Sequence, residues 1–205
     1  MSILQKIPSI NCFGLPLYLG VELALGIAIL NKMSGFYGLL SIFTGHPLDL
    51  SQWIFYFFSI LIIPFYLNGL KNILKPKVIN FAPILVLFSV DTLISLWFVI
   101  YFALEWLLNE DVKFEKKPGQ DYSKSASENF EFGWIICTSI IIQAVRLYST
   151  LVIFSFYKRL LRLTTIQGED VGIDDIELDL KNRNIIEQNF YKIQIGCYKI
   201  LKGKI

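Results

Sequence analysis

Histidine is almost absent from this chain, which has one such residue, His46, among 205. Integral-membrane enzymes that transfer phosphate-linked groups to lipids need one histidine as nucleophile and a second as acid, and a single histidine cannot do both. The sequence also lacks an HxxxxH or HExxH metal pair, an HxxxxD motif, a glycine-rich phosphate loop and a serine nucleophile elbow. We therefore predict that the chain by itself is not an enzyme and that it holds no metal or cofactor.

Cysteine and net charge are also low. The three cysteines, Cys12, Cys137 and Cys197, are scattered, so they provide neither a disulfide framework nor the spacing of a metal site. The formal net charge of +2 is too small for a nucleic-acid-binding surface. We therefore expect no nucleic-acid partner.

Long apolar runs dominate what is present. Hydrophobic residues make up 54 % of the chain, aromatic residues make up 15 %, and the mean hydropathy is +0.53. Soluble domains are less apolar and do not carry several uncharged runs of about 18 residues or more. We predict an all-α membrane protein with four transmembrane helices, at about residues 14–30, 53–70, 81–104 and 133–157.

A shorter apolar segment follows the first predicted helix. The polar and glycine residues of 31–35 interrupt the helical pattern, and the apolar run 36–43 is too short to cross a bilayer. We expect this run to form an interfacial or re-entrant segment. It ends in a polar turn in which Pro47 fixes the entry of the next helix and Asp49 caps it. His46 then belongs to a capped turn and not to a catalytic site.

Basic residues close to the predicted helices indicate the orientation. Four crossings place both termini on one side, and that side also collects the lysines of 71–77 and the basic residues of 158–162. Acidic residues outnumber lysines in the polar loop 109–132. We therefore predict cytosolic termini, a lumenal loop at 109–132, a membrane domain at residues 1–162 and a cytosolic tail at residues 163–205.

The tail combines an acidic linker, residues 169–179, with a basic helix. From Ile185 onward apolar residues follow helical spacing and lysines lie among them. This pattern predicts an amphipathic helix, either on the lipids of an anionic membrane surface or on the cytosolic surface of a partner protein. The residues assigned to this membrane-surface or sorting role are Lys192, Cys197, Lys199, Lys202 and Lys204.

Three ionisable residues, Glu22, Asp91 and Arg146, lie near the midpoints of predicted transmembrane helices. An unpaired charge at the bilayer centre costs at least ~2.5 kcal/mol on insertion scales, so such side chains face protein and pair. We expect a cluster in which the Arg146 guanidinium lies between the two carboxylates. It would either fix how helices pack and with whom, or form the relay of a small transporter or channel. We favour the packing role because no string of polar residues flanks these positions.

Small residues recur every four positions on the first predicted helix, at Gly20, Ala24 and Ala28. A second line contains Glu22 and Gly26. Small residues at this spacing let membrane helices approach closely. We expect the face that carries them to be buried.

A dense set of residues between 16 and 53 also occurs in a known family. It comprises Pro16-Leu17-Tyr18-Leu19, Val21-Glu22, Leu25-Gly26-Ile27, Ile29-Leu30-Asn31-Lys32, Ser34-Gly35, Tyr37-Gly38, Phe43-Thr44-Gly45-His46-Pro47-Leu48-Asp49 and Gln52-Trp53. Asp91-Thr92, Arg146 and Gly196-Cys197-Tyr198-Lys199 extend the match over most of the chain. With these residues the chain resembles the regulatory subunit of fungal inositol phosphorylceramide synthase.

The resemblance implies a multi-pass protein of the Golgi membrane that binds a separate catalytic subunit. In that family the partner transfers phosphoinositol from phosphatidylinositol to ceramide, and the regulatory subunit is needed for activity and for Golgi localisation. The resemblance also implies that the tail engages coatomer, although the ending Lys202-Gly203-Lys204-Ile205 departs from the standard dilysine signal. The residues that we assign to the partner interface or to structure are Glu22, Gly26, Asn31, Gly45, His46, Pro47, Asp49, Trp53, Asp91 and Arg146.

Overall fold

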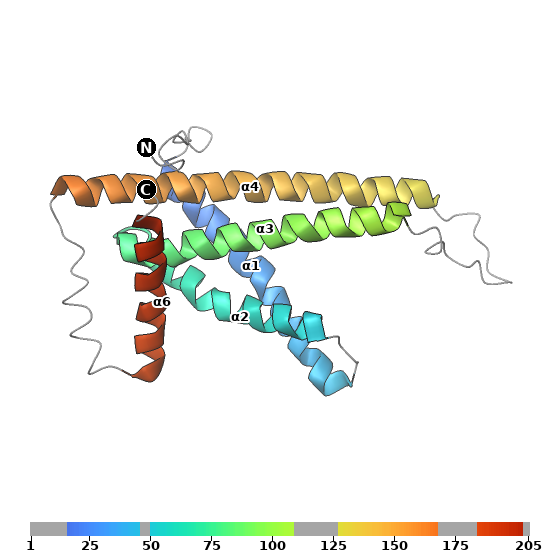
Figure 1. Ribbon diagram of the computed structural model, residues 1–205, viewed down its shortest axis with the longest axis horizontal. Helices are drawn as coiled ribbons and strands as arrows, with labels where there is room; N and C mark the ends of the chain where they lie inside the picture. Colours follow the sequence, from blue (N-terminus) through green and yellow to red (C-terminus); the bar gives the residue numbers. More distant parts are fainter. Residues whose placement is uncertain (1–15, 46–49, 109–126, 168–183, 203–205) are drawn as a thin grey trace. The chain divides into compact units, whose positions relative to one another are not determined.

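The computed structural model describes residues 16–45, 50–108, 127–167 and 184–202. Within these ranges the chain forms five α-helices and no strand (Figure 1). The helices are α1 (Leu17–Thr44), α2 (Leu50–Lys71), α3 (Val78–Leu108), α4 (Glu128–Gln167) and α6 (Ile185–Lys202). The predicted all-α class is confirmed for this part of the chain.

Four of the helices, α1 to α4, are long and apolar enough to cross a membrane, as predicted. The most extended is α4, whose 40 residues correspond to about 60 Å, twice the ~30 Å of a hydrocarbon core. Residues 128–132 were predicted to belong to the lumenal loop, but they form the first turns of α4. The helix begins early because Ser127 caps it: the Phe130 amide donates to the Ser127 hydroxyl at 3.4 Å and to its carbonyl at 2.9 Å.

The predicted break after the first span is wrong, because α1 continues through residues 31–35 to Thr44. Two features make this polar stretch compatible with a helix. The Ser34 hydroxyl donates to the Asn31 carbonyl at 2.6 Å, so its polar group is satisfied inside the helix. Gly35 lies where α1 meets α2 and is not a breaker. An interfacial position for residues 36–43 stays a prediction.

Glycines set the contact between α1 and α2, which lie side by side (Figure 1). A Cβ atom added at Gly35 would lie 3.0 Å from Ser59 Cβ and 3.2 Å from the Tyr56 carbonyl oxygen. A Cβ atom added at Gly38 would overlap the ring of Tyr56. The absence of side chains at these two positions therefore allows the helices to approach closely. The end of α1 is marked by Gly45, whose φ of 70° is left-handed, as in many helix C-caps.

The described chain divides into two compact units, and α3 and α4 contribute to both. The first unit, Met1–Phe88 with Ser149–Ile205, contains α1, α2, α6 and the adjoining ends of α3 and α4. Its core includes an edge-on contact between Phe81 and Phe156, with ring centroids 5.0 Å apart. The second unit, Ser89–Tyr148, contains the remainder of α3 and α4. The predicted division into a membrane domain and a tail stays a prediction.

The helix expected in the tail is present as α6, which belongs to the first unit. Phe190 stacks on Phe65 of α2 with ring centroids 4.4 Å apart. The buried side chains of α6 are Gln194, Ile195 and Tyr198. The apolar line that includes Ile186, Ile193 and Ile200 is exposed. A membrane or partner contact of that line stays a prediction, because the structure contains neither.

Candidate functional site

The second unit is built on a seam between α3 and α4 whose positions alternate in steps of four and three residues. This is the heptad spacing that keeps one face of a helix against a neighbour. On α3 the seam positions are Asp91, Ser95, Phe98, Phe102 and Glu105. On α4 they are Phe132, Ile136, Ser139, Gln143 and Arg146. The two helices are antiparallel, because Arg146 meets Asp91 at one end and Phe132 meets Trp106 at the other.

An ion pair closes the first end of the seam. Arg146 Nη1 lies 3.2 Å from Asp91 Oδ2 and donates a hydrogen bond to it. The side chains are 23 % and 20 % exposed, so both charges are largely withdrawn from the surroundings. Opposite charges at this distance compensate part of the cost of placing each in the bilayer. The pair therefore holds α3 and α4 in one register.

Gln143 adds a second polar link one turn along the seam. It is 5 % exposed, its Nε2 donates to the Thr92 carbonyl at 3.0 Å, and its Oε1 accepts from the Ser95 hydroxyl at 3.1 Å. A buried amide that uses both its donor and its acceptor is stabilising, whereas an unpaired one is costly. We call the ion pair and the contacts of Gln143 the polar lock; it consists of Asp91, Thr92, Ser95, Gln143 and Arg146.

The sequence analysis did not identify Gln143 or Ser95. Ser95 follows Asp91 by four residues and Gln143 precedes Arg146 by three, so each lies on the same helix face as its charged neighbour. A search for polar residues at these spacings in both helices would have found the seam.

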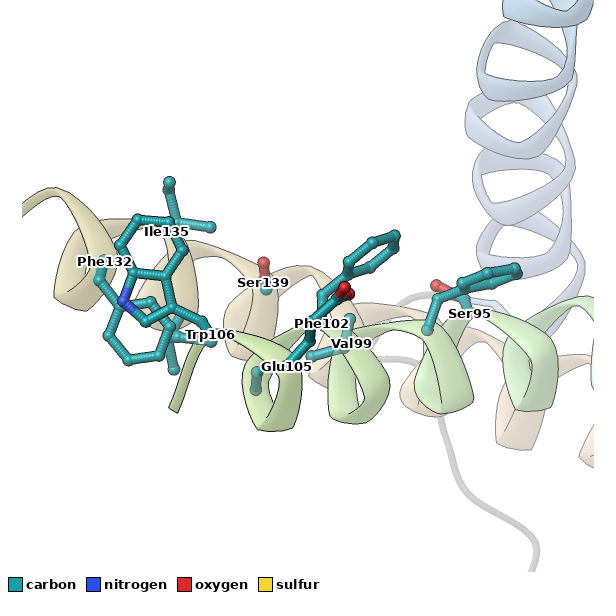
Figure 2. A pocket seen from close by; sticks show the side chains of 11 residues that line it. Ser95, Val99, Phe102, Glu105, Trp106, Phe132, Ile135 and Ser139 are labelled. Carbon is teal, nitrogen blue, oxygen red and sulfur yellow. The ribbon is translucent and has the colours of Figure 1, made fainter. Parts of the chain in front are cut away.

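The other end of the seam opens into a cavity of about 560 Å³, which we call the α3–α4 cleft. Figure 2 shows the side chains that line it. Its lining includes Phe98, Phe102, Glu105, Trp106, Phe132 and Ser139. The Trp106 and Phe132 rings stack with centroids 5.3 Å apart and planes inclined by 7°. A cavity of this size with mostly apolar walls and few polar groups has the character of a ligand site.

Glu22 belongs to the first unit and the Asp91–Arg146 pair to the second, so the expected three-residue cluster stays a prediction. Its side chain is exposed on α1, and no described residue forms a hydrogen bond or ion pair with it. One turn further along α1, a Cβ atom at Gly26 would have no neighbour within 4 Å. The two lines of small residues therefore differ: Gly20 and Ala24 are buried within the chain, whereas Glu22 and Gly26 are open.

The remaining interface candidates have different surroundings. Asn31 is exposed on α1, Gly45 ends α1, and the Trp53 ring lies 6.0 Å from Phe57 on α2. Lys204 and the turn residues His46, Pro47 and Asp49 lie outside the described residues.

In α6, the three described lysines assigned to the tail surface are exposed. They are Lys192, Lys199 and Lys202. Cys197 is half-buried, and burial raises the pKa of its thiol. Among the described residues, no group of three or more histidine, cysteine or acidic side chains could hold a metal.

Four apolar helices, two of which are locked together by an ion pair and an amide, define an α-helical multi-pass membrane protein. Residues 11–128 match the family described as inositolphosphorylceramide synthase subunit Kei1. The chain is also 38 % identical, over 206 residues and 92 % of each chain, to a Saccharomyces cerevisiae protein named inositol phosphorylceramide synthase regulatory subunit KEI1. The chain therefore belongs to the inositolphosphorylceramide synthase subunit Kei1 family, and the resemblance seen in the sequence is confirmed.

A second relative comes from Schizosaccharomyces pombe and is named inositol phosphorylceramide synthase regulatory subunit kei1. It is 30 % identical over 90 residues, which cover 44 % of this chain and 38 % of the relative. No solved structure matches the chain.

Proposed function

We propose that the chain is the non-catalytic regulatory subunit of inositol phosphorylceramide synthase and that it works by binding the catalytic subunit inside the membrane. The observation that carries this proposal is the 38 % identity, over 92 % of both chains, to a protein named as that regulatory subunit. The residue inventory agrees with it, because one histidine cannot act as both nucleophile and acid. The reaction is then performed by the partner.

The exposed side of α1 is the surface best suited to this partner. We call it the Glu22 face, and it consists of Glu22, Gly26, Leu30, Met33 and Tyr37. These positions follow one another at intervals of three or four residues, so they share one side of the helix. The face is otherwise apolar, and a lone carboxylate facing lipid is unfavourable.

A transmembrane helix of the catalytic subunit would remove this cost by presenting a hydrogen-bond donor or a cation to Glu22. Gly26 would allow that helix to come close, because the space beside it is open within the described chain. The face thus offers a small residue for close packing and a charge for choosing the register of the partner.

The relay of a transporter is the weaker explanation of the membrane charges. Asp91 and Arg146 neutralise each other at 3.2 Å, and Gln143 uses both ends of its amide between Thr92 and Ser95. Groups that are satisfied in this way hold two helices together and have no need of an ion from outside. The polar lock therefore supports a structural role within the second unit.

Golgi residence and sorting belong to the same proposal. The chain would lie in the Golgi membrane with both termini in the cytosol, which places the basic end of α4 and the lysines of α6 beside an anionic leaflet. Lys192, Lys199 and Lys202 are exposed, as a contact with that leaflet or with the coatomer would require.

Co-purification in mild detergent tests the proposal. The tagged chain is expressed together with the catalytic subunit, and wild type should recover it in a fixed ratio. Losing one partner of a desolvated charge pair costs about 2–5 kcal/mol, so Glu22→Leu should recover less than about a tenth as much partner when the subunits are limiting. Gly26→Leu should also lower recovery, because the added side chain fills the approach space.

Leu61→Phe is the matched control, since it adds bulk at an exposed position of another helix, α2. Recovery should stay at the wild-type level in this variant. Equal recovery from all four proteins would refute the Glu22 face as the interface. Intact recovery with lost turnover in Glu22→Leu would instead place Glu22 at the active site of the complex.

A further inference from the structure

The α3–α4 cleft is larger than the packing of two helices requires. It encloses about 560 Å³, whereas the neighbouring polar lock brings the same helices within hydrogen-bond distance. Two of the seam positions that line the cleft, Ser95 and Ser139, carry small side chains. A cavity in a helix pair that lies in hydrocarbon loses van der Waals contacts unless something apolar fills it. The available filler is a lipid chain.

The walls of the cleft suit a hydrocarbon chain along its whole length. Phe98, Val99 and Phe102 form the α3 side, and Ile135 and Ile136 form the α4 side. Figure 2 shows Val99 lying between the Trp106–Phe132 stack and Ser95. The stack lies at the end of the cleft that is close to the end of α3, where aromatic rings are typical of the membrane boundary. The cleft therefore runs from this boundary into the bilayer, in the direction of a lipid chain.

One carboxylate decides which headgroup fits. Glu105 lines the cleft three residues before the end of α3, and no described residue forms a hydrogen bond or ion pair with it. In the view of Figure 2 its oxygens lie beside the Phe102 side chain. A carboxylate repels the phosphate of an anionic phospholipid and accepts hydrogen bonds from hydroxyl and amide groups. The Ser95 and Ser139 hydroxyls are further polar groups on the same wall.

We propose that the α3–α4 cleft binds an uncharged membrane lipid that has no phosphate, with a hydrocarbon chain between the aromatic and isoleucine walls and its hydroxyl or amide donors at Glu105. Ceramide belongs to this class, since its headgroup consists of hydroxyls and an amide without phosphate. The biological role of the site rests on the proposed function, in which the subunit would hold the lipid that the catalytic subunit modifies. The binding itself requires no partner and is tested without one.

The full chain is reconstituted alone in phosphatidylcholine nanodiscs with photoreactive probes of ceramide, phosphatidylinositol or phosphatidylcholine, all carrying the same labelled chain. The ceramide probe should label residues of the cleft, and unlabelled ceramide should compete. Ser139→Trp fills the cleft and should reduce labelling to the level left by excess competitor. Ile140→Trp adds the same side chain at the neighbouring exposed position and should label like wild type.

Glu105→Leu tests the headgroup separately, because leucine keeps much of the side-chain volume but cannot accept a hydrogen bond. A hydrogen bond to a charged group changes an equilibrium constant by about tenfold or more, so the preference for ceramide over phosphatidylcholine should fall by about that factor. Equal labelling by all three probes in the wild type would overturn the proposal. So would labelling that survives Ser139→Trp, or cross-links to a helix of the catalytic subunit at Glu105 in the assembled complex.

The labelling experiment tests the lipid site separately from the proposed regulatory function. Wild-type chain that recovers the catalytic subunit but shows no ceramide labelling would reject the lipid site and keep the proposed function. Ceramide labelling without any recovery of the catalytic subunit would keep the site and reject the proposed function.

Discussion

Replacing Arg146 by leucine tests what holds the second unit together. The change leaves the Asp91 carboxylate in the bilayer without its partner at 3.2 Å. Replacing Asp91 by leucine removes the same contact from the Arg146 guanidinium. The double variant Asp91→Leu/Arg146→Leu removes both charges and puts two apolar side chains of suitable size at the end of the seam.

Three magnitudes bound the effect. Losing one partner of a buried pair costs about 3–5 kcal/mol in soluble proteins. A lone Asp or Arg at the centre of a membrane helix costs about 2.5–3.5 kcal/mol on insertion scales, and interhelical polar contacts in membranes contribute at most ~1.7 kcal/mol. Because the side chains are 20 % and 23 % exposed, part of the penalty is relieved by water and headgroups. We expect each single variant to lose about 2–3 kcal/mol and the double variant less than about 1 kcal/mol.

The measurement is an unfolding titration of the full chain in mixed micelles with increasing mole fraction of sodium dodecyl sulfate, followed by the fluorescence of the four tryptophans. The difference between the double variant and the sum of the singles gives the coupling energy. We expect a coupling of about 3–6 kcal/mol, because each single variant removes one member of the pair and the double variant removes both. Additive losses in the three variants would refute the ion pair as the lock of the seam.

The remaining predictions concern three other contacts. Gly38→Ala should lower stability in the same titration by about 1–3 kcal/mol, because the new methyl group overlaps the Tyr56 ring, whereas Gly26→Ala should not, since its Cβ meets nothing within 4 Å. Gln143→Leu should cost about 1–3 kcal/mol, because it removes the two hydrogen bonds that link Gln143 to the Thr92 carbonyl and the Ser95 hydroxyl of α3. Burial raises the pKa of the Cys197 thiol, so less thiolate is present at pH 8 and iodoacetamide should modify the folded chain more slowly than the denatured chain. In a chain with Cys197 as its single cysteine, equal rates at pH 8 would contradict this assignment.

The membrane class and the number of candidate membrane helices could be predicted from the sequence. Hydropathy adds up along one chain, so a run of about 20 apolar residues indicates a membrane helix whatever lies beside it. The predicted ends of the helices were less accurate, because caps and local hydrogen bonds determine where a helix begins and ends. Ser127 starts α4 ahead of the predicted boundary, and the Ser34 hydroxyl keeps α1 helical where a break was expected.

The site was predicted in part. Charges inside apolar runs are visible in any sequence, and Asp91 and Arg146 were identified in this way. That they meet, and that Gln143 and Ser95 join them, depends on two helix faces more than 40 residues apart in the chain. The cleft could not be predicted, because a cavity is the volume left over after side chains from both helices have packed.

By itself the sequence determined a helical membrane protein of this family with too few histidines for a mechanism that uses one as nucleophile and another as acid, because residue content and hydropathy do not depend on neighbours in space. The tertiary structure determined which of two similar lines of small residues on α1 packs within the chain. Gly20 and Ala24 are buried, whereas Glu22 is exposed and the space beside Gly26 is empty. It also decided that the glycines at 35 and 38 serve helix contact and do not break the helix. Both outcomes depend on which other helix each face of α1 contacts. That contact forms only when helices distant in the sequence pack together.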